Sequence, residues 1–277
     1  MVLRGWAITI AILWVIQDAI VFPGWWFRRE DPVSLHERAD AHGFRIVTVP
    51  ADDGGTATLW VHSVGANRAV LFWHGNGELV ADHVALADRL ASMGWDFVGV
   101  ELRGFGDAPG WPRQATLDRD ASAAWLWATT SGGYDPGRIV VHGRSVGGGP
   151  AAQLAARIHP SGLVLESTFD SLAAVAQDRV PFVPGLPWLM RSPYVTADLT
   201  LSMPVFQVHC GADEVVDISH ARSLRKVLPN ATVVEVEGCH HSDPVLLLDE
   251  RAGQAWVAWL EQTVPKQLEN AQVPDGQ

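Results

Sequence analysis

Ser145 lies at the centre of a G-x-S-x-G pattern, GRSVG, and is the residue best placed for nucleophilic chemistry. The pattern follows the apolar run RIVVH and opens a segment rich in glycine and alanine, which is typical of a strand, a sharp turn and a helix. Glycines on both sides allow the turn without a side-chain clash, and the start of a helix favours developing negative charge. This context predicts that the Ser145 hydroxyl attacks a carbonyl and forms an acyl-enzyme.

A serine nucleophile needs a histidine base and a carboxylate that orients the histidine. In chains of this pattern the expected order is nucleophile, acid, histidine. His240 and His241 follow the strand-like run TVVEVE, and we favour His240 as the base and His241 as a flanking polar contact. Asp213 follows the run PVFQVH and is the favoured acid, with these rivals: Glu214, Asp217 and Glu166.

The segment HGNGE, residues 74–78, ends another apolar run and is the candidate oxyanion loop. A loop at that position can turn a backbone N–H toward the reacting carbonyl. The amides of Asn76 and Val146 would then form an oxyanion hole, with each donor lowering the barrier by ~3 kcal/mol. A plain structural turn with a buried histidine is the alternative. This chemistry requires neither a metal nor an organic cofactor.

Strand and helix patterns alternate along the chain, which predicts an α/β fold with a mostly parallel sheet and helices on both faces. The Asp52-Asp53-Gly54-Gly55 turn predicts a hairpin. The expected strands are 44–49, 56–63, 68–73, 95–100, 138–141, 162–165, 205–209 and 232–236. The expected helices are 79–93, 117–129, 146–158, 218–228 and 245–260.

The proline-rich, apolar stretch at about 169–201 interrupts this alternation and is expected to form a lid or a wall for an acyl chain. Ordinary packing of a long connection is the alternative. We expect the hydrolase-like domain to cover residues 30–262 and to be followed by a polar tail, 263–277.

Residues 1–29 depart from the composition of a soluble domain. The run from Gly5 to Ile16 carries no charge, and aromatic residues stand beside arginines at Trp25–Arg29. The favoured interpretation is a membrane anchor, single-pass or interfacial, that takes no part in the triad. A cleaved signal peptide and a buried core helix are the alternatives. Asp18 opposes a span, because a carboxylate near mid-bilayer costs ~3 kcal/mol.

Composition excludes one class of partner. The formal net charge of −11 argues against nucleic acid, because binding phosphates requires clustered lysine and arginine. The two cysteines, Cys210 and Cys239, have no metal-ligand spacing. We interpret them as two unrelated thiols; a disulfide would form only if the fold brought them together.

Several segments together resemble the alpha/beta-hydrolase superfamily and, within it, the BEM46-like membrane-associated hydrolases. They are QDAIVFPG, HGNGE, ELRGFGDAPG, GRSVGGGP, ESTFDSL, GADEVVD and GCHHSD, in the family's order. The resemblance implies Ser145 as nucleophile, Asp213 as acid, His240 as base, and Asn76 and Val146 as oxyanion donors. Two positions depart from the family pattern: Ala108 replaces a usual serine, and His241 replaces an asparagine that is common after the histidine.

These features favour a serine hydrolase that cleaves a carboxylic ester or thioester. The apolar N-terminus and lid favour a small-molecule or lipid-like acyl substrate. A serine peptidase of the aminopeptidase type is one alternative, and a catalytically inactive, membrane-tethered binding protein is another.

Overall fold

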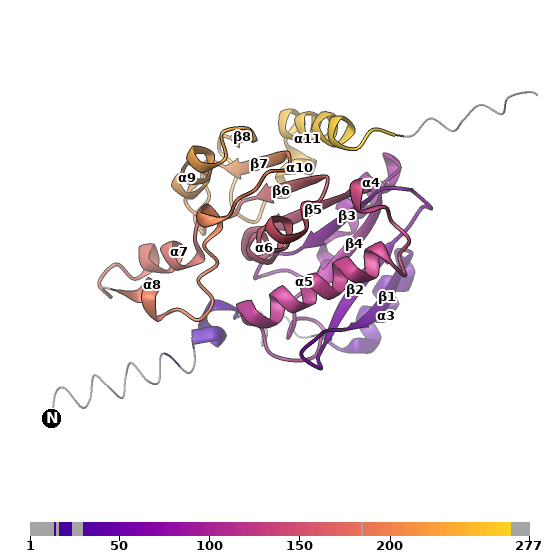
Figure 1. The fold of residues 1–277 in the computed structure, drawn as a ribbon, viewed down its shortest axis with the longest axis horizontal. Coiled ribbons are helices and arrows are strands. Elements are labelled where there is room, and N and C mark those ends of the chain that lie inside the picture. Colours follow the sequence, from indigo (N-terminus) through magenta and orange to yellow (C-terminus); the bar gives the residue numbers. More distant parts are fainter. Residues whose placement is uncertain (1–13, 15–16, 24–29, 184, 267–277) are drawn as a thin grey trace, which may run out of the picture.

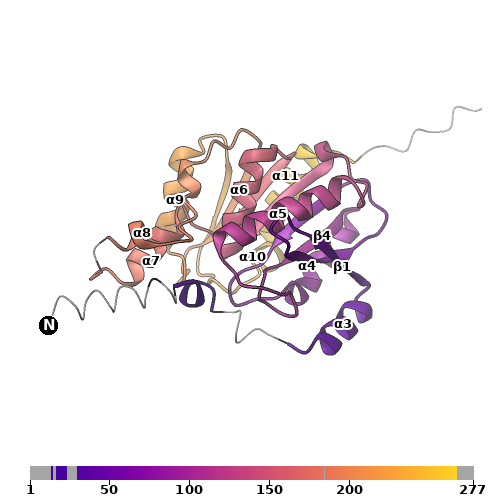
Figure 2. The ribbon, with the colours of Figure 1, turned by 60° about the horizontal axis from the view of Figure 1, so that its bottom comes forward.

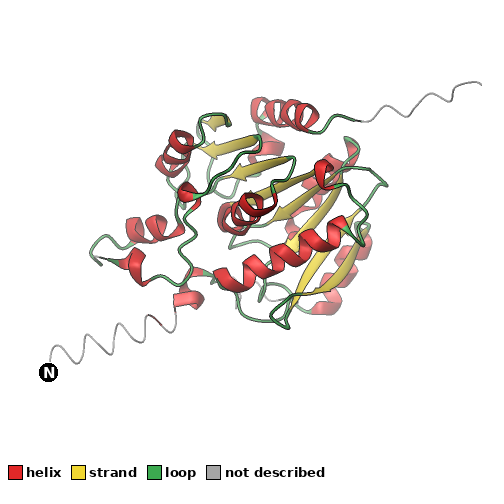
Figure 3. Ribbon diagram, viewed as in Figure 1, coloured by secondary structure: helices red, strands yellow, loops and turns green. Residues whose placement is uncertain are grey.

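The computed structural model describes residues 14, 17–23, 30–183 and 185–266. Its centre is an eight-stranded sheet with the order β1-β2-β4-β3-β5-β6-β7-β8. The first two strands form an antiparallel hairpin, and β2 pairs antiparallel with β4. All other neighbours are parallel. The predicted α/β fold with a mostly parallel sheet is therefore confirmed (Figures 1 and 3).

Each of the eight predicted strands is present, within a few residues of its expected ends. The strands are β1 (Phe44–Pro50), β2 (Thr56–His62), β3 (Ala69–Trp73), β4 (Asp96–Glu101), β5 (Ile139–Arg144), β6 (Gly162–Glu166), β7 (Val205–Cys210) and β8 (Thr232–Val236). Every residue of the five strands β3, β4, β5, β6 and β7 is buried. Side chains alternate between the two faces of a strand, so both faces of the central sheet are covered.

One covering helix precedes the first strand and the others follow later strands, and α5 and α6 lie in front of the sheet in Figure 1. They are α3 (Pro32–Ala41), α4 (Val84–Ser92), α5 (Gln114–Thr129), α6 (Gly148–Ile158), α9 (Ile218–Val227), α10 (Val245–Leu248) and α11 (Glu250–Thr263). Among the described residues, four tryptophans are fully buried in the core: Trp60, Trp73, Trp95 and Trp256. Arg68 is also buried and binds Glu261 and the carbonyl of Val264, which fixes the end of α11 beside the start of β3.

The expected lid lies between β6 and β7 and contains two short helices, α7 (Leu172–Arg179) and α8 (Leu186–Leu189). Both helices stand at one side of the domain, next to the short helical stretch formed by residues 17–21 (Figures 1 and 2). Phe182 and Trp188 project from this region with 79% and 91% of their surfaces exposed.

The expected boundary at residue 29 is wrong, because the chain already packs into the domain between Gln17 and Phe22. Phe22 is 0% exposed and belongs to the main core, and Asp18 is buried as well. Asp18 is compensated by Arg191, whose Nη2 lies 3.3 Å from its carboxylate, so burial does not leave an isolated charge.

Most of the predicted membrane anchor, Gly5 to Ile16, lies outside the described residues. Within the described ranges, no helix is long and apolar enough to cross a membrane.

Candidate active site

Ser145 sits directly after β5, in the 3-10 turn η3 (Ser145–Gly147) that leads into α6. Its φ is +51°, a left-handed conformation that is uncommon for a residue with a side chain. Thr168 stabilises this turn by donating its Oγ1–H to the Ser145 carbonyl at 2.7 Å. A Cβ at Gly147 would lie 2.6 Å from the carbonyl oxygen of His74, so this position requires glycine. The G-x-S-x-G pattern thus folds as the strained turn that the sequence predicted.

A continuous hydrogen-bond chain connects Ser145 to a histidine and a carboxylate. The Ser145 hydroxyl lies 2.9 Å from Nε2 of His241. The other ring nitrogen of His241, Nδ1, lies 2.7 Å from Oδ2 of Asp213. Ser145 and Asp213 are each 6% exposed and His241 is partly buried, so the three groups are largely shielded from solvent.

The prediction that His240 is the histidine at Ser145 is wrong. The His240 ring is exposed, and its Nδ1 lies 3.2 Å from Oε2 of Glu214. Its backbone N–H donates to the carboxylate of Asp243, and its carbonyl accepts from the Asp243 N–H. This closed turn sends His240 outward and leaves the next side chain, His241, facing the site.

Asp213 occupies the position expected of the acid, and the three rivals are engaged elsewhere. Glu214 contacts the exposed His240, and Asp217 caps the start of α9 through the N–H of Ser219. Glu166 is bound to Arg144 and His142 at the end of β6.

The Asp213 carboxylate is surrounded by donors. Oδ1 accepts the N–H groups of Val215 and Val216 at 2.9 and 2.7 Å. Oδ2 faces His241 and also lies 3.4 Å from Nε2 of His209. Burial alone would raise the pKa of Asp213, but the hydrogen bonds from His209 and His241 outweigh it and hold the pKa well below its usual range. Asp213 is therefore ionised when it contacts His241, as an orienting carboxylate must be.

Cys210 and Cys239 form a disulfide, so the interpretation as two unrelated thiols is wrong. Cys210 ends β7, three residues before Asp213, and Cys239 stands two residues before His241. The backbone of the same two loops is also joined, because the N–H of Ala212 donates to the Cys239 carbonyl at 3.1 Å. The disulfide thus connects the loop that carries the acid to the loop that carries the histidine.

The candidate oxyanion loop lies beside the serine. A Cβ added to Gly75 would stand 3.2 Å from the Cβ of Ser145, which places Asn76 next to the nucleophile. The Asn76 side chain turns away and donates to the carbonyl of Val21 at 2.6 Å. Val146 occupies the first turn of the helical segment, where N–H groups have no acceptor within the helix. Both residues are therefore beside Ser145, and their backbone donors remain the predicted oxyanion hole.

The N-terminal segment contacts both sides of the site, which the sequence did not predict. Besides accepting from Asn76 through Val21, it binds the lid through Gln17. The Gln17 side chain accepts the Arg191 N–H at 2.6 Å and donates to the Leu189 carbonyl at 3.3 Å. Residues 17–22 therefore connect the candidate oxyanion loop to the segment expected to form a lid.

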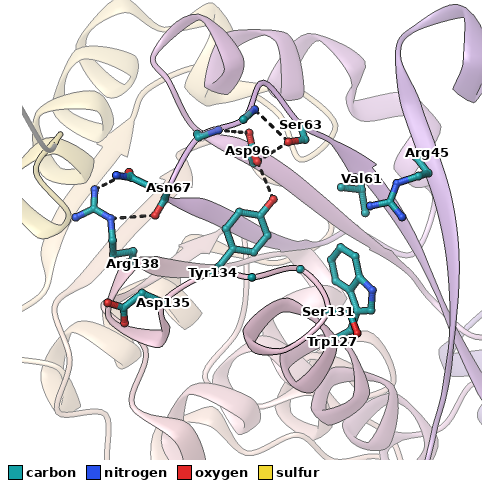
Figure 4. A pocket seen from close by; sticks show the side chains of 14 residues that line it. Arg45, Val61, Ser63, Asn67, Asp96, Trp127, Ser131, Tyr134, Asp135 and Arg138 are labelled. Carbon is teal, nitrogen blue, oxygen red and sulfur yellow. Dashed lines mark hydrogen bonds between the residues drawn. The ribbon is translucent and has the colours of Figure 1, made fainter. Parts of the chain in front are cut away.

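A polar pocket of about 490 Å³ lies elsewhere on the domain (Figure 4). Most of its residues precede β3 and β5 or begin β4, at the amino ends of the parallel strands, whereas Ser145 follows a carboxyl end. Asp96 in this pocket already accepts from Ser63, Tyr134 and two backbone N–H groups. The buried carboxylate of this pocket is therefore satisfied within the domain, and the pocket lies at the opposite ends of the strands from Ser145. Among the described residues, no cluster of three or more His, Cys, Asp or Glu side chains is arranged to hold a metal ion.

Comparison with known proteins agrees with this geometry. A family model described as the alpha/beta hydrolase fold matches residues 68–197. An uncharacterized protein of Mycobacterium tuberculosis is 34% identical over 86% of this chain and 85% of its own length. Alpha/beta hydrolase domain-containing protein 17B of Homo sapiens is 30% identical over 75% of this chain and 70% of its own. The chain belongs to the alpha/beta-hydrolase superfamily.

Solved structures show the same fold at lower identity. An alpha-beta hydrolase from Vibrio vulnificus aligns with a TM-score of 0.71 and 22% identity, covering 87% of this chain and 91% of its own. An esterase from Pyrococcus furiosus aligns with a TM-score of 0.65 and 16% identity, covering 85% of this chain and 97% of its own. Membership of this superfamily supports a hydrolase, and the chemistry must be argued from the site itself.

Proposed function

We propose that this protein hydrolyses carboxylic esters or thioesters through an acyl-enzyme on Ser145. The observation that carries the proposal is the chain from the Ser145 hydroxyl through His241 to Asp213, with distances of 2.9 and 2.7 Å. Both distances are short enough for direct proton transfer and orientation. The strained turn holds the hydroxyl at the carboxyl end of the sheet, where the Asn76 loop also ends.

Each residue then has a defined step. His241 Nε2 takes the proton of the Ser145 hydroxyl as the oxygen attacks the carbonyl carbon, and the tetrahedral oxyanion accepts from the amides of Asn76 and Val146. The protonated His241 gives its proton to the leaving alcohol or thiol. Water then attacks the acyl-enzyme with the same histidine as base, and Ser145 is released with its proton. Asp213 stays ionised throughout and stabilises the imidazolium.

The favoured substrate has a lipid-like acyl group. Phe182 and Trp188, both in the lid region, are largely exposed, and the N-terminal segment beside the lid leads toward the uncharged run that begins at Gly5. Large apolar side chains exposed in one segment favour an apolar ligand or surface. Comparing p-nitrophenyl acetate with longer-chain esters tests this class; a kcat/KM that falls as the chain lengthens would contradict it.

Ser145→Ala tests the reaction itself. We expect the variant to lose turnover of p-nitrophenyl butyrate and of the matching thioester while keeping the wild-type melting temperature. Ser167→Ala is a suitable control, because Ser167 is also buried but follows a different strand. Undiminished turnover by folded Ser145→Ala would refute the proposed nucleophile. Cleavage of an aminoacyl anilide in preference to both esters would instead favour a peptidase.

We also propose that the chain preceding Trp14 associates with a membrane. The uncharged run supports this, and the packing of residues 17–22 into the domain requires any anchor to end before Gln17. The disulfide favours an oxidising compartment, because such bonds rarely persist in the reducing cytosol. Recovery of the full-length protein in the pellet after an alkaline carbonate wash is the expected result, and recovery in the soluble fraction would contradict it.

A further inference from the structure

Arg144, the variable residue of the G-x-S-x-G pattern, has a buried guanidinium that contacts three different parts of the chain. Its Nε donates to Oε1 of Glu78 at 2.8 Å, and its Nη1 donates to Oε1 of Glu166 at 2.5 Å. Its Nη2 donates to the backbone carbonyl of His241 at 2.8 Å. One side chain next to Ser145 therefore binds the last residue of the candidate oxyanion loop, the end of β6 and the histidine loop.

The first contact fixes the oxyanion loop. The second carboxylate oxygen of Glu78, Oε2, accepts the N–H of Gly75 at 2.7 Å and also lies 3.2 Å from His83. Gly75 is the residue whose added Cβ would stand 3.2 Å from Ser145. Arg144 therefore determines, through Glu78, where the backbone before Asn76 lies relative to the nucleophile.

The other contacts fix the base and anchor the network. Holding the His241 carbonyl limits movement of the loop that presents the imidazole to Ser145. Glu166 braces the far side of the guanidinium, and its second oxygen is held 2.9 Å from Nε2 of His142 on β5. Glu166 is thus held by β5, the same strand that ends at Ser145.

The charges explain why the network holds together when buried. Burial raises the pKa of a carboxyl group, but the Arg144 cation helps to hold the pKa values of Glu78 and Glu166 below their usual range. Both carboxylates therefore remain ionised acceptors. A planar guanidinium donates in several fixed directions, whereas a lysine ammonium is a compact point charge on a flexible stem. The three contacts require arginine.

We propose that Arg144 is a positioning residue for hydrolysis. It fixes the positions of the oxyanion loop and the His241 loop relative to Ser145. The inference rests on the proposed serine hydrolase function. It assigns Arg144 no contact with substrate, and its effect passes through Glu78 and the His241 backbone.

Arg144→Lys tests the proposal, because it keeps the charge between the two carboxylates and removes the three-way geometry. The matched control is Arg103→Lys, since Arg103 is also buried between two carboxylates, those of Asp53 and Asp120, and makes no contact with the triad. The assay measures melting temperature, kcat and KM for p-nitrophenyl butyrate, and the rate of labelling by a fluorophosphonate.

We expect Arg144→Lys to lower kcat and the labelling rate by about 10²-fold, the size of effect caused by a misplacement of about 1 Å at a catalytic site. KM should change little, and Arg103→Lys should keep the wild-type kcat below its melting temperature. If Arg144→Lys does not fold, Glu78→Gln provides the second test. It leaves either Arg144 or Gly75 without its acceptor and should also lower kcat with little change in KM.

The outcomes distinguish a failure of the positioning role from a failure of the proposed hydrolase function. Wild-type protein that labels at Ser145, with an Arg144→Lys variant that labels at the same rate, would overturn the positioning role and leave the hydrolase intact. Equal losses of kcat in Arg144→Lys and Arg103→Lys would show a general effect of stability and also overturn it. Wild-type protein that neither labels nor hydrolyses esters would overturn the proposed function, and this inference with it.

Discussion

Breaking the disulfide between Cys210 and Cys239 should destabilise the domain and weaken catalysis together. The bond closes a loop with a sequence separation of 29 residues. The chain-entropy relation gives roughly 3.5 kcal/mol for a loop of this length. For a domain of this size, each kcal/mol shifts the melting temperature by about 2–4 °C, so a decrease of roughly 7–14 °C is expected.

Catalysis should fall because the same bond joins the loops that carry Asp213 and His241. The backbone hydrogen bond from Ala212 to Cys239 remains after reduction, so the loops stay near each other. We therefore expect kcat to fall by less than the ~10²-fold that accompanies a displacement of about 1 Å. Activity should decrease at temperatures where the reduced protein is still folded.

The assay compares thermal unfolding and esterase turnover before and after treatment with a reductant, with thiol titration to confirm that the bond has opened. The double variant Cys210→Ser and Cys239→Ser is the control and should not respond to the reductant. The reasoning fails if the reduced protein, with both thiols titrated, melts at the same temperature as the oxidised protein. Two free thiols in oxidised wild-type protein would refute the disulfide itself.

Three further predictions follow from individual contacts. His241→Ala should lower kcat by about 10⁴-fold or more, as loss of a catalytic base does. The adjacent variant, His240→Ala, should keep most of the activity. The reverse result would restore His240 as the base, as the sequence predicted. Asp18→Ala should lower the free energy of unfolding by about 1–3 kcal/mol, since it leaves Arg191 without its carboxylate. It should also lower kcat by loosening the segment between the lid and the oxyanion loop. An unchanged midpoint of urea unfolding together with an unchanged kcat would contradict this. The hydrogen bonds that the His220 ring donates to the carboxylates of Asp170 and Asp178 raise the pKa of His220 above its usual value. Its protonated form therefore stabilises the fold below about pH 6.5, and this contribution is lost as the pH rises through the raised folded-state value; His220→Gln should flatten that part of the stability–pH curve, and identical curves would refute it.

The sheet could be predicted from the sequence because its strands carry local signals. Buried parallel strands are nearly continuous apolar runs, and β3 to β7 each contain such a run between turn residues. Helix α3 was missed, because only Leu35 and Ala39 among its residues are buried and its apolar periodicity is weak. Its capping signal, Asp31 followed by Pro32, is present in the sequence and marks where the helix begins.

The site was predictable where a local pattern fixes it and not where distant segments meet. Ser145 and Asp213 follow strand ends and are recognisable from the chain alone. The choice between His240 and His241 depends on a turn closed by Asp243. This turn places His241 at Ser145, whereas the motif favoured His240. The disulfide forms because the pairing of β7 with β8 brings the Cα atoms of Cys210 and Cys239 to 5.0 Å from each other. This is a long-range contact that no local pattern indicates.

The Arg144 network was also invisible in the sequence. Its partners come from three segments separated along the chain, and each of them has an ordinary local explanation. Glu78 was part of the oxyanion-loop motif, and Glu166 was considered only as a rival acid. Their common role appears only when the carboxyl ends of the strands meet at one edge of the sheet.

In the proposed hydrolase reaction, Ser145 is the nucleophile and His241 activates it. The most direct measurement is peptide mass spectrometry of the protein after reaction with a fluorophosphonate, performed on wild type, His241→Ala and His240→Ala. We expect a single adduct on the peptide that contains Ser145, formed rapidly in wild type and His240→Ala and nearly absent in His241→Ala. An adduct on another residue, or unmodified Ser145 in folded wild-type protein, would contradict it.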